Sequence, residues 1–278
     1  MTSKLEIARS QKKPVKFLAS RLLMRSGLCR LITMDMGGFR LRFFPSALSA
    51  QYWIDRQDRS CDTDFIARYV KPGDNIIDIG ANIGALALAA AAAAGRQGHV
   101  LAAEPHPRIY GYLVSNIELN GFVNITPVNA AAAANGTGVR ISDSNADDEN
   151  RLSDEGIDVP ARALDDMARL LYGEIALLKI DTEGCEKFVL DGGAKTLART
   201  SCVYFESCQS QFARYGYTCA ELFNSLEAAE FSVYRKTGDT VLERLPEGYI
   251  SSKCENLFAL KNEEMFSSRT GWTTRFYK

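Results

Sequence analysis

A repeated alternation of short apolar segments with helical segments limits the fold of this chain more than any other feature. The segments "NIIDI" (75–79), "HVLAAE" (99–104) and "EIALLKID" (174–181) have the length and the aliphatic content of buried strands. Segments with helical patterns, about 10 to 15 residues long, separate such strands. Because strands joined through helices of that length form parallel crossovers, we predict an α/β fold with a doubly wound, mostly parallel sheet.

The same patterns predict the remaining elements of a seven-stranded sheet. Further strands are expected at 124–133, 201–207, 231–235 and 255–261, and helices at 60–70, 84–96, 107–121, 183–199 and 220–230. The helix at 60–70 is expected to be capped by Asp62 or Thr63, and the helix at 183–199 to bend at Gly192-Gly193. The closing pair of strands, with "TGD" in the connection, is expected to end the sheet antiparallel. The polar stretch 143–156 is expected to be a loop.

The N-terminal segment differs from the rest of the chain in charge. Residues 1–42 contain ten Lys and Arg against Glu6 and Asp35, a charge of +8 in a chain whose net charge is −1. A basic arm on an acidic body is not the basic surface of a nucleic-acid-binding domain, so we expect no nucleic-acid partner. We divide the chain into a basic N-terminal extension (1–56), a main domain (57–262) and a C-terminal tail (263–278).

Residues 14–32 are expected to form a helix with a break near Ser26-Gly27, and a strand is expected within 37–45. One face of the helix holds four apolar residues, Phe17, Met24, Leu28 and Leu31. Arg21 lies close to that face, whereas a helix on a membrane surface segregates its charges better. We therefore favour docking of this helix onto the protein's own body or a partner over peripheral membrane contact.

Cysteine usage indicates reduced thiols. The seven cysteines are odd in number and contain no C-x-x-C pair, which fits neither a zinc site nor a disulfide framework. No apolar run reaches the roughly 18 residues that span a bilayer, and no signal-peptide pattern opens the chain. Because His99 and His106 are the only histidines, a multi-histidine metal site is nearly excluded. We expect a cytoplasmic protein without a transmembrane segment.

The loop after the strand at 75–79 carries the first functional signal. In "DIGANIG", Gly80 and Gly84 bracket a turn, but Asn82 stands where a dinucleotide fingerprint has its second glycine. Asp78 would also repel a pyrophosphate across a short distance. Both departures favour a cationic ligand such as S-adenosylmethionine, whose α-ammonium group can pair with Asp78 directly or through water. The alternative is that Asp78 only caps the following helix.

A second carboxylate follows the next strand. Glu104 lies 24 positions after Gly80, where an acidic residue can accept hydrogen bonds from both ribose hydroxyls of NAD or S-adenosylmethionine. The alternative is that Glu104 is only a solvated residue at the end of a strand. Four further cofactor contacts are expected from their positions alone, with the last two beside the adenine: Ala81, Pro105, Asn129 and Ala130. His106 is expected to be a neighbour of the adenosine rather than a base.

The stretch "LLKIDTEGCEKFVLDGG" supplies a cluster of carboxylates at the same edge of the sheet. Asp181 and Glu183 follow one strand and Glu206 ends the next, so we take these three as candidate catalytic residues. Methyl transfer from a sulfonium depends mainly on alignment, and it needs a base when the acceptor is an alcohol. Glu186 is expected to have a structural role in a first helical turn. A Mg²⁺ site at these carboxylates is the less favoured alternative, and we expect no resident metal.

These motifs together resemble the FkbM-type methyltransferase family. The similarity rests on "GDNIIDIGANIGALALAAA", "EPHPRIYGYLVSNIELNG", "VNAAA", "LLKIDTEGCEKFVLDGG" and "VYFES" in that order, across about half of the chain. The resemblance implies a class I, Rossmann-like methyltransferase fold, S-adenosylmethionine as cofactor and a hydroxyl of a sugar, polysaccharide unit or polyketide as acceptor. It also implies cofactor contacts from Asp78, Gly80, Asn82, Gly84 and Glu104, and a signature acidic pair formed by Asp181 and Glu183.

We therefore predict an S-adenosylmethionine-dependent O-methyltransferase that acts on a small-molecule or saccharide acceptor. Two alternatives remain. A nicotinamide-dependent oxidoreductase is opposed by Asp78 and Asn82. A non-catalytic module that keeps the cofactor pocket and recruits a partner through its N-terminal arm is opposed, more weakly, by Asp181 and Glu183.

Overall fold

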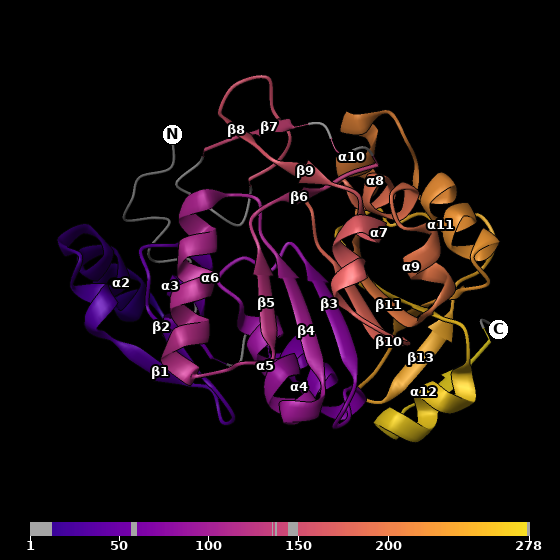
Figure 1. Ribbon diagram of the computed structural model, residues 1–278, viewed down its shortest axis with the longest axis horizontal. Coiled ribbons are helices and arrows are strands. Elements are labelled where there is room, and N and C mark those ends of the chain that lie inside the picture. Colours follow the sequence, from indigo (N-terminus) through magenta and orange to yellow (C-terminus); the bar gives the residue numbers. More distant parts are fainter. Residues whose placement is uncertain (1–12, 57–59, 135, 137, 144–149, 277–278) are drawn as a thin grey trace.

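The computed structural model describes residues 13–56, 60–134, 136, 138–143 and 150–276. Its centre is a nine-stranded sheet in the order β15-β13-β12-β14-β11-β10-β3-β4-β5 (Figure 1). In chain order these strands are β3 (Asn75–Ile79), β4 (His99–Ala103), β5 (Ile125–Val128), β10 (Ile175–Ile180), β11 (Thr200–Ser207), β12 (Ser232–Lys236), β13 (Val241–Arg244), β14 (Glu255–Leu260) and β15 (Thr273–Arg275). The predicted doubly wound α/β architecture is confirmed.

The strands from β11 to β5 run parallel to one another. Strand β3 lies between β10 and β4, so the order of the sheet reverses on its two sides. In such sheets ligands bind outside the carboxyl ends of the strands at the point of reversal. In Figure 1 the arrowheads of β3, β4 and β5 point to the same edge, and the small sheets β6-β9 and β7-β8 lie above that edge.

The other end of the sheet is antiparallel, as expected from the closing strands. Strand β14 pairs antiparallel with both β11 and β12, and β12 pairs antiparallel with β13. Strand β15 then adds in parallel to β13. Strands β13 and β15 extend the sheet beyond the seven strands expected. The sequence did not predict them because "VLER" and "TTR" are too short and polar to show a strand pattern. The segment after Asn262 thus contributes α12 (Glu263–Thr270) and an edge strand to the sheet.

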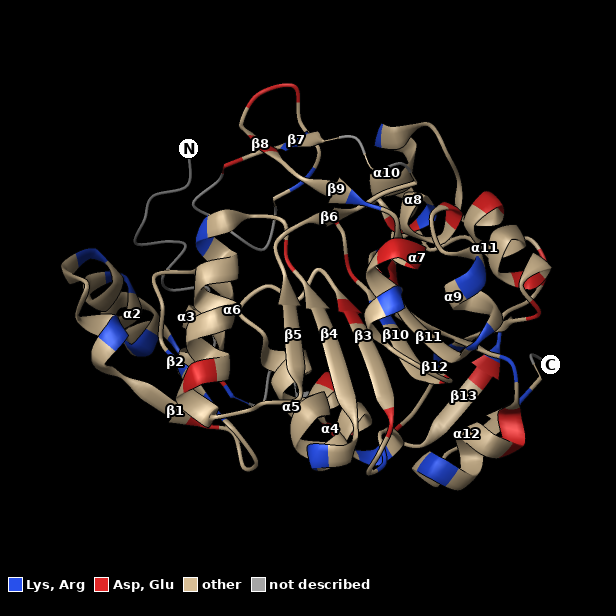
Figure 2. Ribbon diagram, in the orientation of Figure 1, with Lys and Arg blue, Asp and Glu red and all other residues tan. Residues whose placement is uncertain are grey.

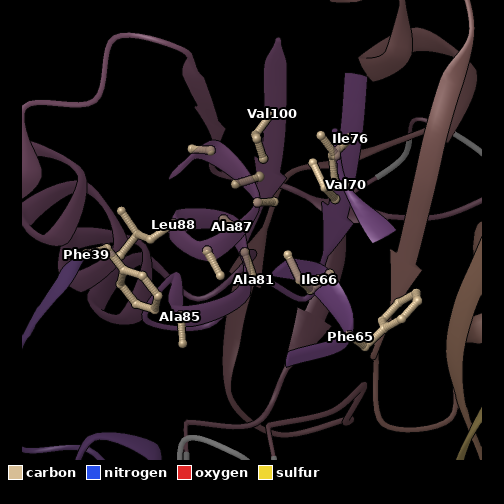
Figure 3. Close-up of a cluster of buried hydrophobic side chains, with 14 of the residues drawn as sticks. Phe39, Phe65, Ile66, Val70, Ile76, Ala81, Ala85, Ala87, Leu88 and Val100 are labelled. Atoms are coloured by element: carbon tan, nitrogen blue, oxygen red, sulfur yellow. The ribbon is translucent and has the colours of Figure 1, made fainter. Parts of the chain in front are cut away.

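Helices cover both faces of the sheet and bury two hydrophobic cores. In β3, Ile76 belongs to one core and its neighbour Ile77 to the other, which follows from the alternation of side chains along a strand. Figure 3 shows side chains of the first core, among them Ile66, Ile76 and Leu88. The helices of that side include α4 (Ser60–Tyr69), α5 (Ala85–Ala94), α6 (Pro107–Asn120) and α12. Those of the other side include α7 (Leu164–Met167), α8 (Glu186–Asp191), α9 (Ala194–Ala198), α10 (Gln209–Phe212) and α11 (Cys219–Ala228).

Two local expectations need correction, whereas the described residues of a third agree with it. Helix α4 already begins at Ser60, so Asp62 and Thr63 lie inside it rather than at its cap. The strand expected at 124–133 ends at Val128, and Ala131–Ala132 forms β6, which pairs with β9 (Ala161–Arg162). Strands β7 (Val139–Ile141) and β8 (Ile157–Val159) border the expected loop at 143–156, of which 144–149 lies outside the described residues.

The helix expected at 183–199 is interrupted rather than bent. A Cβ atom on Gly192 would lie 2.4 Å from the Ala133 carbonyl oxygen, and one on Gly193 would lie 2.6 Å from Leu164 Cδ2. Both glycines therefore permit a close approach of neighbouring segments. The result is two short helices, α8 and α9, in place of one long helix.

The N-terminal segment packs against α6 and adds to the first hydrophobic core. It contains α2 (Pro14–Ser26), the 3₁₀ turn η1 (Leu28–Leu31), the hairpin β1 (Thr33–Asp35) and β2 (Arg40–Arg42), and α3 (Ala47–Ile54). The predicted break is confirmed at Gly27, which has φ 76°. Two asparagines of α6 fasten this segment: the backbone N–H of Arg42 donates to Asn116 (2.9 Å) and that of Arg40 to Asn120 (2.7 Å).

The expectation that all cysteines are reduced is wrong for one pair. Cys208 and Cys254 form a disulfide, whereas Cys29, Cys61, Cys185, Cys202 and Cys219 are free. The pair follows from the sheet, since Ser207 of β11 lies opposite Glu255 of β14. The cysteines are 46 residues apart, so their spacing carried no signal. The prediction of a cytoplasmic location loses part of its support. In the described part of the chain, none of the helices has the length and apolar character that a membrane crossing requires.

Candidate active site

A cavity of about 470 Å³ lies at the carboxyl ends of the parallel strands. This volume is within the range of small-molecule binding sites, roughly 300 to 1,000 Å³. Ten of the twelve predicted site residues line it: Asp78, Gly80, Ala81, Asn82, Glu104, Pro105, Ala130, Asp181, Glu183 and Glu206. Gly84 and Asn129 are not among the lining residues. The topology thus gathers residues from across the sequence at one point.

Gly80 fixes the path of the loop after β3. It has φ 75°, and a Cβ atom there would lie 1.8 Å from the carbonyl oxygen of Asp181. The N–H groups of Gly80 and Ala81 both donate to the Ala103 carbonyl (3.0 and 2.9 Å). The loop is therefore clamped between the ends of β10 and β4, and only glycine fits at its first turn.

Gly84 and Asn129 do not line the cavity but support segments next to it. A Cβ atom on Gly84 would lie 2.5 Å from Leu113 Cδ1, so this glycine lets the start of α5 approach α6. The side-chain amide of Asn129 donates to the carbonyl groups of Glu104 (2.8 Å) and Pro105 (2.9 Å). Asn129 therefore shapes the turn after β4, whereas Ala130 lines the cavity itself.

Glu104 is a buried carboxylate with a fixed orientation, not a solvated strand end. Its two oxygens accept hydrogen bonds from the backbone N–H groups of Asn82 (3.0 Å) and His106 (2.9 Å). The first bond joins Glu104 to the glycine loop. His106 caps α6 by accepting from the Arg108 N–H (3.2 Å), and its Nε2 lies 3.0 Å from Asp143. His106 does not line the cavity.

Lys179 is a site residue that the sequence analysis missed. Its side chain is buried in β10, and its ammonium lies 3.1 Å from Asp78 Oδ1 and 3.7 Å from Asp181 Oδ2. It also donates to the Gly80 carbonyl oxygen (2.8 Å). Burial alone would lower the pKa of Lys179, but the two carboxylates outweigh that effect and raise it above its usual value. The sequence could have indicated this residue, since a lysine inside the apolar run "LLKI" is expected to be buried and a buried lysine needs a paired charge.

The three candidate catalytic carboxylates lie together, and one of them, Asp181, is the second ion-pair partner of Lys179. Asp181, Glu183 and Glu206 each place an oxygen within 4.8 Å of the others, and all three are partly exposed. Glu183 has φ 55°, and its Oε2 accepts a hydrogen bond from Gln211 Nε2 (2.8 Å). Such oxygens can accept hydrogen bonds from a substrate hydroxyl or ligate a hard cation.

Glu186 takes the structural role that its position suggested. Its side chain is fully buried, and Oε1 accepts hydrogen bonds from the backbone N–H (2.9 Å) and the hydroxyl (3.0 Å) of Thr182. These bonds shape the loop between β10 and α8. Burial raises the pKa of Glu186 to about 7, although the hydrogen bond from the Thr182 N–H opposes that shift.

The charge of the cavity selects among ligands. Six acidic residues line it, Asp62, Asp78, Glu104, Asp181, Glu183 and Glu206, against two basic residues, Lys179 and Arg151. The excess of negative charge attracts cations and repels a pyrophosphate. S-adenosylmethionine carries two cationic groups and no phosphate, so the residues present fit this cofactor.

Comparison with solved structures finds methyltransferases, each with a low TM-score. A proposed rRNA methylase of Clostridium thermocellum has 9% identity and a TM-score of 0.47, with 72% of this chain and 93% of that chain covered. The precorrin-6y C5,15-methyltransferase of Geobacter metallireducens has 15% identity and a TM-score of 0.43, with 72% and 87% covered. A SAM-dependent O-methyltransferase of Thermotoga maritima has 20% identity and a TM-score of 0.42, with 72% and 64% covered.

Comparison by sequence gives a family. A search of the curated proteins found no match. The profile described as "Methyltransferase FkbM domain", in contrast, matches residues 78–233, from the aspartate before the glycine loop to the start of β12. This match spans more than half of the chain. It includes the glycine loop and the acidic cluster formed by Asp181, Glu183 and Glu206. The chain belongs to the FkbM methyltransferase family.

Proposed function

We propose that this methyltransferase uses S-adenosylmethionine to methylate a hydroxyl group of a sugar, a polysaccharide unit or a polyketide-like metabolite. The observation that carries the proposal is the pair of buried carboxylates Asp78 and Glu104, which lie beside the glycine loop at the reversal point of the sheet. A cofactor that is positively charged and lacks phosphate suits this pair.

The cofactor half of the cavity has fixed acceptors. Glu104, held by the N–H groups of Asn82 and His106, is placed to accept hydrogen bonds from the two ribose hydroxyls. Asp78 already contacts Lys179, so we propose that it acts on the α-ammonium group through water rather than as a direct partner. The small side chains of Ala81 and Ala130 leave room for the nucleoside.

The acidic cluster serves the acceptor. Bound S-adenosylmethionine supplies an activated methyl group with a good leaving group, and the protein must then align a hydroxyl oxygen with it. We propose that Asp181 accepts the hydroxyl proton as the new carbon–oxygen bond forms, while Glu183 and Glu206 hold neighbouring hydroxyls. Asn256 and Tyr52, which also line the cavity, offer further hydrogen bonds of the kind that a saccharide uses. The negative cavity disfavours a nucleic acid as acceptor.

Two ligand titrations test the cofactor. S-adenosylhomocysteine is expected to bind and raise the melting temperature, whereas NADH is expected to do neither. Glu104→Gln tests the role of the cavity carboxylate in this binding. Glu174→Gln is its matched surface control, since Glu174 lies outside the cavity. Binding of NADH without S-adenosylhomocysteine would establish the oxidoreductase alternative.

A transfer assay tests the reaction. The purified chain, methyl-labelled S-adenosylmethionine and a panel of saccharides and polyketides are expected to give a labelled ether, with S-adenosylhomocysteine as the second product. Cofactor binding without transfer to any acceptor in a wide panel would favour the non-catalytic module. Label in an amine or in RNA instead would overturn the choice of acceptor while keeping the cofactor.

A further inference from the structure

The N-terminal helix and the turn after it expose an unusual amount of apolar surface. Five large aliphatic side chains are exposed there: Val15 (79%), Leu18 (48%), Leu22 (70%), Leu28 (54%) and Leu31 (81%). They make up half of the ten large hydrophobic residues that are exposed in the described ranges. We call these five residues the aliphatic patch. A patch that gathers so many apolar side chains in one short segment marks an interaction surface.

Docking of the helix onto the protein does not account for the patch. Ser20 is buried, and Leu23 and Met24 pack against the hydrophobic core, so one face of α2 is already used. The helical period places Val15, Leu18 and Leu22 on a separate stripe that points away from that face. Leu28 and Leu31, which the sequence pattern grouped with the docking face, are exposed as well. The helix therefore has two apolar stripes, and the side chains of the outer one are exposed to solvent.

The charges within this segment have one sign, although Lys13 pairs with Asp55 at the end of α3 (2.9 Å). From Lys13 to Met34 the sequence has no Asp or Glu, and it has Lys13, Lys16, Arg21, Arg25 and Arg30. All five basic residues are exposed. Figure 2 shows α2 with basic segments and no acidic ones. Arg21 and Arg25 lie one turn after Leu18 and Leu22, at the border of the stripe.

We propose that the aliphatic patch and its basic border bind an anionic lipid membrane surface. A helix that lies in such a surface buries aliphatic side chains at the boundary of the acyl chains and keeps Lys and Arg among the anionic head groups. A protein partner fits less well, because protein interfaces are enriched in aromatic residues, whereas the patch is aliphatic throughout. The sequence alone did not separate this stripe from the docked face, which becomes visible because the partly buried Leu23 and Met24 pack against the core.

The surface is connected to the cavity through one helix. Helix α3 lies next to α2, with Lys16 over the ring of Trp53 at 5.7 Å, and its residues Leu48 and Tyr52 line the cavity. A membrane-bound chain would thus hold its cavity close to the head groups, where lipid-linked saccharides are presented. This statement about the acceptor rests on the proposed methyl transfer, whereas membrane binding itself does not.

Vesicle sedimentation tests the binding. The full chain is expected to co-sediment with vesicles of phosphatidylglycerol and phosphatidylcholine, to bind less as salt rises, and to stay in solution with phosphatidylcholine alone. The double variant Leu18→Glu/Leu22→Glu is expected to weaken the partition by at least roughly a hundredfold. The control Leu170→Glu/Tyr172→Glu changes two residues that are at least as exposed as Leu18 and Leu22 but far from α2 in sequence, and it is expected to bind as the wild type does.

Several outcomes would overturn the proposal. They are a chain that ignores anionic vesicles, a Leu18→Glu/Leu22→Glu variant that still binds them, and a patch that forms a dimer in sedimentation equilibrium in place of binding lipid. Melting temperatures show whether each variant is folded, which is expected because all four positions are exposed. S-adenosylhomocysteine affinity is measured on the same samples. A chain that binds vesicles but has no affinity for S-adenosylhomocysteine would refute the proposed function and leave membrane binding intact.

Discussion

The ammonium group of Lys179 lies 3.1 Å from the Asp78 carboxylate and 3.7 Å from that of Asp181, so one buried cation joins the cofactor loop to the acidic cluster. Lys179 and Asp78 are register partners in β10 and β3, which brings their side chains to the same face of the sheet. The lysine side chain then reaches the Gly80 carbonyl oxygen at the turn. We therefore expect cofactor binding and acceptor binding to be coupled through Lys179.

Lys179→Met is expected to destabilise the fold by about 3 to 5 kcal/mol, because it leaves Asp78 buried without its counter-charge. Urea unfolding measures this loss. The double variant Lys179→Met/Asp78→Asn removes both charges, so it is expected to recover much of the stability but not the affinity for S-adenosylhomocysteine. A single Lys179→Met variant as stable as the wild type would contradict this account of the pair.

Gly80→Ala is expected to abolish S-adenosylhomocysteine binding in calorimetry. The new Cβ atom would lie 1.8 Å from the Asp181 carbonyl, so the loop and the end of β10 must separate. Gly121→Ala is the matched control, since Gly121 also has a positive φ (64°), in the left-handed helical region, but would place its Cβ atom with nothing within 4 Å. The control is expected to bind normally and lose only about 1 to 2 kcal/mol of stability. Equal effects of the two substitutions would show that backbone strain, rather than the contact with Asp181, decides the outcome.

Glu186 is expected to make stability depend on pH. Its pKa is raised by burial from 4.5 in the unfolded chain to about 7 in the folded protein, so between these values the folded state holds the extra proton. The stabilisation is therefore fully present below about pH 4.5 and is lost as the pH rises towards 7 and above. Glu186→Gln mimics the protonated form at every pH.

The measurement is the difference in the free energy of unfolding between Glu186→Gln and the wild type across that range. It is expected to shift in favour of the variant by about 3 kcal/mol from pH 4.5 to pH 8. A Glu221→Gln variant, whose carboxylate lies in the exposed capping box of α11, controls for the general effect of an amide. A difference that stays constant with pH would mean that the fold does not raise the pKa of Glu186.

The parts of the site that are local in sequence could be predicted, and those that depend on strand register could not. "NIIDI" is a strand from Asn75 to Ile79 as predicted, and the glycines and Glu104 follow from fixed offsets to strands. The Asp78–Lys179 pair joins residues that are 101 positions apart, and only the pairing of β3 with β10 brings them together. The Cys208–Cys254 disulfide depends in the same way on the register of β11 and β14.

Close contacts between backbone segments were also invisible in the sequence. Gly192 and Gly193 looked like a bend in one helix, but the segments around Ala133 and Leu164 that require them come from distant parts of the chain. Short polar edge strands such as β15 have no hydrophobic period to reveal them. What the sequence leaves open is thus the set of long-range contacts, since composition and period report only on the local chain.

Asp181→Asn is expected to keep the affinity for S-adenosylhomocysteine and to reduce methyl transfer by about 10² to 10⁴-fold, the usual contribution of a general base. Asp191→Asn provides the control, because its carboxylate pairs with Lys187 on the surface of α8 and does not line the cavity. Both variants are assayed with labelled donor on an acceptor that the wild type methylates. Loss of cofactor binding with the transfer step intact would move Asp181 to the cofactor site.

Chelation separates a proton acceptor from a metal ligand at the same cluster. We expect turnover to survive dialysis against EDTA, because the ammonium of Lys179 already places a positive charge 3.7 Å from Asp181, and Gln211 holds Glu183 by a hydrogen bond. A bound Mg²⁺ would instead need Asp181, Glu183 and Glu206 as ligands, and Glu183→Gln and Glu206→Gln would then each raise the metal concentration required for turnover. Activity that EDTA abolishes and Mg²⁺ restores would therefore reassign the three carboxylates from acceptor alignment to metal binding.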